Sequence, residues 1–119
     1  MKVVVLGASP HPWRYSWLAV ERLLEAGHEV VPIGNKEAQV AGLPILTDIP
    51  QIEHVDTVTI YLNPDNQQAY ADWLVETLRP RRLIFNPGAE NPPLQASARQ
   101  AGIEVVNACT LVMLSTGQF

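Results

Sequence analysis

A polar turn near the start of the chain carries residue types that bind phosphate. Residues 3–6 are the apolar run VVVL, a small-residue turn follows at residues 7–9, and residues 14–16 read Arg-Tyr-Ser. Backbone N–H groups at the start of a helix have no partner within the helix, so they attract anions. We therefore predict a phosphate or nucleotide site at this turn, contacted by Gly7, Ala8, Ser9, Arg14, Tyr15 and Ser16.

Each of these side chains also has a simpler explanation. Ser9 and Ser16 fit helix caps, which is the commoner role of serine at a helix start. Arg14 fits an exposed side chain whose stem lies over Trp13 or Trp17. At this stage the residue types leave both interpretations open.

The end of the second predicted strand narrows the choice of nucleotide. A dinucleotide fingerprint reads Gly-x-Gly-x-x-Gly, but Ser9 and Pro12 occupy its second and third glycine positions. NAD sites place Asp or Glu after the second strand, where this chain has Asn35 and Lys36. A cation there suits a phosphate on the ribose, which NADP and coenzyme A (CoA) both carry. The alternative is a solvated loop lysine.

The composition excludes several classes of protein. The 119 residues carry a net charge of −4 and only 17% charged side chains, so no basic surface indicates a nucleic-acid partner. We expect one domain, because the chain is too short for two hydrophobic cores. No apolar run is long enough for a membrane span or resembles a signal peptide, and the single cysteine cannot form an internal disulfide. These features favour a cytoplasmic location.

Strand and helix patterns alternate along the chain. We predict strands at 3–6, 29–33, 56–62, 82–85 and 103–106, with a short additional strand within 42–46. Helices are predicted at 15–26, from Asn63 to Pro80 and at 91–98, with a short helix or turn at 110–114. Such alternation is typical of right-handed crossovers, so we predict a Rossmann-like three-layer α/β domain with a five-stranded, mostly parallel sheet.

Ligands of open parallel sheets bind beyond the carboxyl ends of the strands. At those ends this chain places asparagines and turn residues, from which we add Asn35, Lys36, Asn63, Pro64, Asn86 and Gly88 to the predicted site. Glu90 is most simply a surface or capping carboxylate, and Cys109 a buried inert thiol. His11, His28 and His54 lie in separate segments, so we predict neither a metal site nor a catalytic residue.

The ordered series of motifs resembles the family of small single-domain CoA-binding proteins. The resemblance covers Gly7-Ala8-Ser9, Pro12, residues 14–16, Val31-Pro32-Ile33 before Asn35-Lys36, and Leu46 to Pro50. Members of this family are similar to the nucleotide-binding part of the succinyl-CoA synthetase α subunit without its catalytic domain. The resemblance implies CoA at the carboxyl edge of the sheet, with Lys36 near the ribose phosphate and residues 62–64 near the adenosine. The segments after the third and fourth strands depart from the pattern of many members.

We therefore expect the protein to bind CoA or an acyl-CoA without a complete active site of its own. The expected partners are this nucleotide ligand and, as a possibility left open, a second copy or a partner enzyme, with no nucleic acid and no membrane. One alternative is an NADP-binding oxidoreductase-like domain, for which 119 residues leave little room. Another is an interaction module whose ligand site has decayed.

Overall fold

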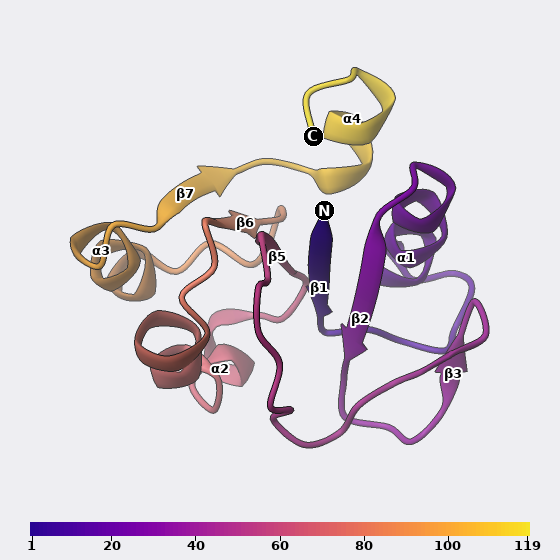
Figure 1. Cartoon of the computed structure of the whole chain (residues 1–119), viewed down its shortest axis with the longest axis horizontal. Helices are drawn as coiled ribbons and strands as arrows, with labels where there is room; N and C mark the ends of the chain where they lie inside the picture. Colours follow the sequence, from indigo (N-terminus) through magenta and orange to yellow (C-terminus); the bar gives the residue numbers. More distant parts are fainter.

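The computed structural model describes all 119 residues and contains seven strands and five helical segments (Figure 1). The strands are β1 (Lys2–Leu6), β2 (Glu29–Ile33), β3 (Gln39–Val40), β4 (Leu43–Pro44), β5 (Thr57–Ile60), β6 (Arg82–Phe85) and β7 (Glu104–Asn107). The helices are α1 (Tyr15–Glu25), α2 (Pro64–Gln67), the π-helix η1 (Trp73–Leu78), α3 (Pro92–Gln100) and α4 (Thr110–Ser115).

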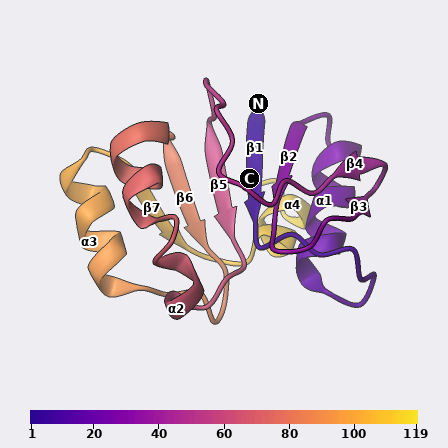
Figure 2. The same cartoon turned by 90° about the horizontal axis from the view of Figure 1, so that it is seen from below.

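Five strands form one parallel sheet in the order β2-β1-β5-β6-β7. The sheet grows from β1 first to β2 and then, on the other side, to β5, β6 and β7. The crossover helices therefore lie on opposite faces of the sheet, because α1 and α3 pack on different sets of β1 side chains. Figure 2 shows α1 beside β2 and α3 beside β7, at the two ends of the row of strands. This arrangement confirms the predicted Rossmann-like α/β fold.

Alternate residues of β1 enter two separate hydrophobic cores, as the two-residue period of a strand requires. Val4 and Leu6 pack in the core that includes Trp73 and Leu94, beneath η1 and α3. Val3 and Val5 pack in the second core with Leu23 of α1. All four strand residues are fully buried. The unbroken apolar run at 3–6 thus reflects a central strand covered on both faces.

Predicted helix boundaries agree with the observed caps. Asn63 precedes Pro64 and accepts a hydrogen bond from the Asn66 N–H at 3.0 Å, as an N-cap does. Gly27 and Gly102 adopt positive φ values of 88° and 82° after α1 and α3, the conformation expected of glycine beyond a helix end.

Two predicted elements are shorter than expected. The third predicted strand spans only Thr57–Ile60, because Tyr61 and Leu62 leave the strand and line a cavity. The single helix predicted after Asn63 is instead interrupted, with α2 ending at Gln67 and η1 beginning at Trp73. The interruption follows Gln67, whose buried side chain is hydrogen-bonded to two neighbouring loops. Periodicity alone carries no sign of such contacts.

The chain ends meet at the amino edge of the sheet. The Met1 amine lies 3.2 Å from Nδ1 of His28, and the ring of Phe119 lies 5.3 Å from the His28 ring. Phe119 also accepts a hydrogen bond from Arg82 Nη1 through its carbonyl oxygen and packs against that guanidinium group. Both ends therefore lie away from the carboxyl edge, where ligands of such sheets bind.

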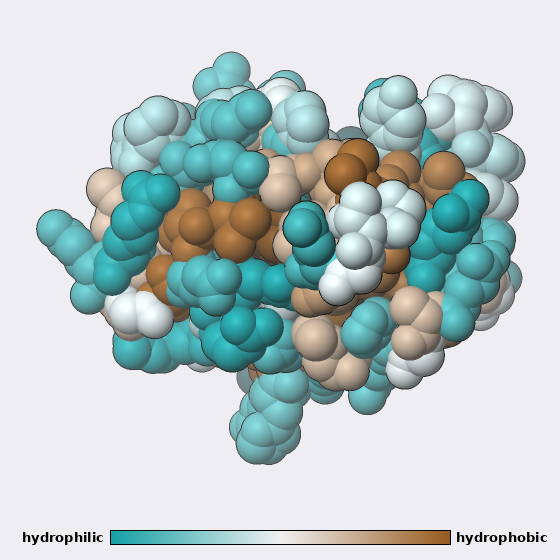
Figure 3. Space-filling model, turned by 90° about the horizontal axis from the view of Figure 1, so that it is seen from above, coloured by the Kyte–Doolittle hydropathy of each residue, from teal (hydrophilic) through white to brown (hydrophobic).

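Apolar surface is divided into separate areas on the face that carries α4. Figure 3 shows hydrophilic side chains between these areas. Among large apolar and aromatic side chains, Val112 of α4 is exposed, and so are Met1, Trp13, Tyr15 and Ile49 elsewhere. No helix combines the length and the apolar character needed to cross a membrane.

Candidate functional site

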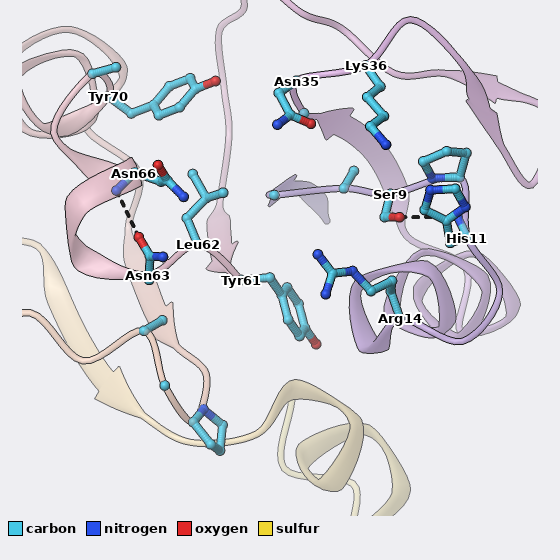
Figure 4. A pocket seen from close by; sticks show the side chains of 18 residues that line it. Ser9, His11, Arg14, Asn35, Lys36, Tyr61, Leu62, Asn63, Asn66 and Tyr70 are labelled. Atoms are coloured by element: carbon cyan, nitrogen blue, oxygen red, sulfur yellow. Dashed lines mark hydrogen bonds between the residues drawn. The ribbon is translucent and has the colours of Figure 1, made fainter.

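A cavity of about 760 Å³ opens at the carboxyl edge of the sheet, between β1 and β5. This position is the topological switch point, where crossovers to the two faces of the sheet diverge and leave a crevice. Four segments line the cavity, namely residues 7–14, 34–36, 61–70 and 87–89 (Figure 4). Its volume lies within the range of sites for small molecules and cofactors.

The wall contributed by the first two segments, here called the basic half, carries two free cations. Arg14 and Lys36 are exposed, and neither side chain makes a hydrogen bond or ion pair within the protein. Arg99 is the other unpaired cation among the eight Lys and Arg residues. No Asp or Glu lines the cavity, although acidic residues outnumber basic ones twelve to eight in the chain. The cavity is therefore suited to an anionic ligand.

The backbone of the first turn is less available to an anion than the sequence indicates. The N–H groups of Gly7 and Ala8 both donate to the carbonyl of Ile33 at 2.8 Å. Gly7 and Ala8 thus join the first turn to the end of β2 and do not present free donors, which corrects the expectation for these two residues. At the start of α1, the N–H groups of Tyr15 and Ser16 have no acceptor in the protein.

Two further contacts shape the basic half. A Cβ on Gly34 would lie 2.4 Å from the Ala8 carbonyl oxygen, so only glycine allows this close approach of the two backbones. The Ser9 hydroxyl is nearly buried and accepts from the His11 N–H at 3.1 Å. The His11 ring stacks on Trp13 with centroids 4.6 Å apart. These contacts hold the loop that carries Arg14.

The opposite wall, here called the neutral half, carries uncharged side chains. Its lining residues are Tyr61, Leu62, Asn63, Asn66, Ala69, Tyr70, Pro87, Gly88 and Ala89. In Figure 4, Asn63, Asn66 and Tyr70 lie across the cavity from Ser9, His11 and Arg14. Carboxamide and phenol groups can hydrogen-bond an uncharged polar ligand, and Leu62 and Ala89 offer apolar contact.

The structure brings eight of the twelve predicted site residues to this cavity. Those eight are Gly7, Ala8, Ser9, Arg14, Asn35, Lys36, Asn63 and Gly88. The other four do not line it. Tyr15 is 75% exposed, Ser16 is buried in α1, and Pro64 lies beside a smaller groove between α2 and α3.

Asn86, the fourth of these residues, has a structural role. Its Nδ2 donates to Thr59 Oγ1 at 2.7 Å and to the Ile60 carbonyl at 3.0 Å, and its Oδ1 accepts from the Thr110 N–H at 2.8 Å. These bonds connect β5, β6 and the start of α4 in the interior. The side chain therefore has no donor left for a ligand.

The titratable groups near the cavity do not form an acid–base pair. Burial raises the pKa of Tyr61 to about 12. The Tyr61 hydroxyl is buried and has no hydrogen-bond partner. Glu90 accepts from the Gly88 N–H at 2.7 Å, and Cys109 is half-buried instead of fully buried as expected. A phenol with such a high pKa is a poor base near neutral pH.

Sequence reasoning missed several residues of the site. Tyr61, Asn66 and Tyr70 line the cavity because the chain leaves β5 early and the following helix is interrupted. Asn63 at the helix cap was the available signal, because a cap fixes the path of the residues on either side. Gly34, between a strand and a polar turn, was a second signal.

Comparison with known proteins identifies the family and the fold. A family model for a CoA binding domain matches residues 1–115. The crystal structure of an uncharacterized protein is 49% identical, with 99% of this chain and 97% of that chain covered and a TM-score of 0.96.

More distant structures share the fold. A protein from Thermus thermophilus is 23% identical over 99% of this chain and 90% of its own, with a TM-score of 0.85. A conserved hypothetical protein from Pyrococcus furiosus is 26% identical over 93% of this chain and 97% of its own, with a TM-score of 0.77. Because the family model spans nearly all of the sequence, from the first turn through β7 and on into α4, the chain belongs to the family of CoA-binding domains.

Proposed function

We propose that the protein binds CoA or an acyl-CoA in the cavity between β1 and β5. One observation carries the proposal: two unpaired cations, Arg14 and Lys36, face a cavity without carboxylates in a chain of net charge −4. CoA carries a diphosphate and a ribose phosphate, so it supplies two separated anionic groups. In this assignment Arg14, which lines the cavity, binds the diphosphate.

Lys36 binds the ribose phosphate in the same assignment. It follows the end of β2, where an acidic residue binds ribose hydroxyl groups in NAD sites. The neutral half then receives the part of the ligand that carries no phosphate. The amide groups of pantetheine or the edge of the adenine match the carboxamides of Asn63 and Asn66.

We further propose binding without a reaction carried out by this chain alone. The cavity lining contains no cysteine and no carboxylate, and His11 is stacked on Trp13. General acid–base catalysis needs a group whose pKa lies near the working pH and within reach of the reacting atom. Tyr61, with a pKa of about 12, does not meet this requirement.

A thermal unfolding series tests the ligand. A ligand at about 100 times its dissociation constant adds about 2.7 kcal/mol to the free energy of unfolding. We expect CoA and acetyl-CoA to raise the unfolding temperature more than dephospho-CoA, NADP and NAD do. Native mass spectrometry of the purified protein identifies any ligand that is already bound. Equal shifts with all five compounds, or a shift with NADP alone, contradict the proposal.

A further inference from the structure

Gln67 is a fully buried amide directly behind the neutral half of the cavity. Its side chain has no exposed surface, and it is not among the lining residues. Its Nε2 donates to the Leu62 carbonyl at 2.8 Å and to the Ala89 carbonyl at 2.7 Å. Its Oε1 accepts from Asn91 Nδ2 at 2.9 Å. Because both N–H groups are engaged, the amide is held in one orientation.

These bonds join two loops that no other side-chain hydrogen bond connects. Leu62 belongs to the loop between β5 and α2, and Ala89 to the loop between β6 and α3. Both loops line the neutral half. The distance between the Leu62 and Ala89 carbonyls is thus set by one NH₂ group that bonds to both.

The basic half is held by a separate set of contacts. Its two loops are joined by the bonds from Gly7 and Ala8 to the Ile33 carbonyl and by the close approach of Gly34 to Ala8. Gln67 makes no hydrogen bond with any of these residues. A change at Gln67 therefore acts on one wall of the cavity and leaves the other wall in place.

We infer that Gln67 is a positioning residue that determines how the cavity discriminates among phosphate-bearing ligands. The inference rests on the proposed function. Phosphate groups, which many nucleotides share, bind the basic half. The rest of the ligand contacts the neutral half. Gln67 holds Leu62 and Ala89 at a spacing that accepts an uncharged polar chain or ring. Affinity for that part of the ligand depends on Gln67, and affinity for phosphate does not.

The experiment compares two ligands on three variants of the full chain. Gln67→Met removes the amide at similar length, and Gln67→Asn keeps it but is too short to reach both carbonyls. Gln95→Met is the matched control, because Gln95 is also a buried helix glutamine, bonded to Asn107 and away from the cavity. Calorimetry with CoA and with inorganic pyrophosphate is done below the unfolding temperature of each variant.

We expect both Gln67 variants to bind CoA about ten-fold more weakly, the effect of losing one buried hydrogen bond, with pyrophosphate affinity unchanged. Amide hydrogen exchange without ligand should be faster at Ala89, whose N–H donates to the Asn86 carbonyl, but unchanged at Ala8. Unchanged CoA affinity in a folded Gln67 variant, or equal losses for both ligands, overturns the inference. If the wild-type protein does not bind CoA, the proposed function fails, and the exchange data alone decide whether Gln67 positions these loops.

Discussion

Arg14 and Lys36 differ from most cations of this protein in having no protein partner. Lys2, Arg22 and Arg81 all lie within ion-pair distance of carboxylates. A cation without a protein partner contributes little to the stability of the fold. It can form a charge-assisted hydrogen bond when a phosphate binds. We therefore attribute their common position at one cavity to the proposed ligand.

Lys36→Ala tests which phosphate this residue contacts. A charge-assisted hydrogen bond contributes about 1.5 kcal/mol or more, so we expect affinity for CoA to fall about ten-fold. Dephospho-CoA lacks the ribose phosphate, so its affinity should stay the same. Calorimetry with both ligands measures the difference.

Lys2→Ala is the control for general charge effects, because Lys2 lies at the opposite edge of the sheet and donates to the Glu53 carbonyl. Equal losses for CoA and dephospho-CoA in the Lys36 variant would assign Lys36 to a shared part of the ligand instead.

At the scale of elements, the β1–α1 loop and the β2–β3 turn act as one unit because Gly34 lets their backbones touch. Any side chain at position 34 would overlap the Ala8 carbonyl. The first loop carries Arg14 and the second carries Lys36. The distance between the two cations is thus fixed by a contact that involves neither of them.

Gly34→Ala should disturb both stability and binding. Overpacking at a tight contact costs about 1–3 kcal/mol, and here the loops must separate to admit the methyl group. We expect lower stability in urea unfolding together with weaker CoA binding.

The control for that variant is Gly42→Ala, where an added Cβ meets nothing within 4 Å but the φ value is +79°. That variant should lose stability through backbone strain and keep its CoA affinity. Unimpaired CoA binding in a folded Gly34→Ala protein would show that CoA affinity does not depend on the spacing of the two loops.

Most of the sheet could be predicted from the sequence, because each central strand is a short apolar run between turn residues. The strands at 29–33 and 82–85 have the predicted bounds. Lys36 and Arg14 could be placed at the carboxyl edge, since they follow β2 and precede α1. The contacts of Gln67 could not be predicted, because one of its partners is 22 residues away and belongs to a different loop. For the same reason the interruption between α2 and η1 was missed.

At the scale of the whole molecule, the two edges of the sheet have different charge arrangements. The carboxyl edge has unpaired cations, whereas the amino edge has paired charges. Arg81 donates to Asp56 Oδ1 at 2.8 Å through Nε, and to Glu104 at 3.3 Å through Nη1. These bonds connect the chain before β5, before β6 and at the start of β7. The amino edge is thus fixed by ion pairs, and the carboxyl edge is left free for a ligand.

The amino-edge pair should make stability depend on pH. The hydrogen bond from Arg81 is the main reason that the pKa of Asp56 lies below its ordinary value of 3.8. A lowered pKa means that the stabilisation is present above pH 3.8 and is lost as the pH falls through the lower, folded-state value. Because Arg81 is half exposed, we expect Asp56→Asn to cost about 0.5–1 kcal/mol at neutral pH.

Urea unfolding of the wild type and of Asp56→Asn at neutral pH and at about pH 2 measures this contribution. The difference should shrink as the pH falls through the folded-state pKa of Asp56, because the carboxyl group then becomes uncharged like the asparagine side chain. Glu25→Gln is the control, since Glu25 forms an exposed pair with Arg22 at 3.9 Å and should have little effect at either pH. A difference that persists in acid would mean that Asp56 acts through something other than its charge.

The meeting of both chain ends beside His28 has a practical consequence for measurement. Because Met1 and Phe119 lie at the amino edge and the cavity opens at the carboxyl edge, a tether at either end leaves the cavity mouth facing the solvent. The protein can be immobilised on a sensor surface through either chain end, and in both cases the carboxyl edge with its cavity remains exposed. Ligand association rates measured in the two orientations should therefore agree, which gives an internal check on every affinity discussed above.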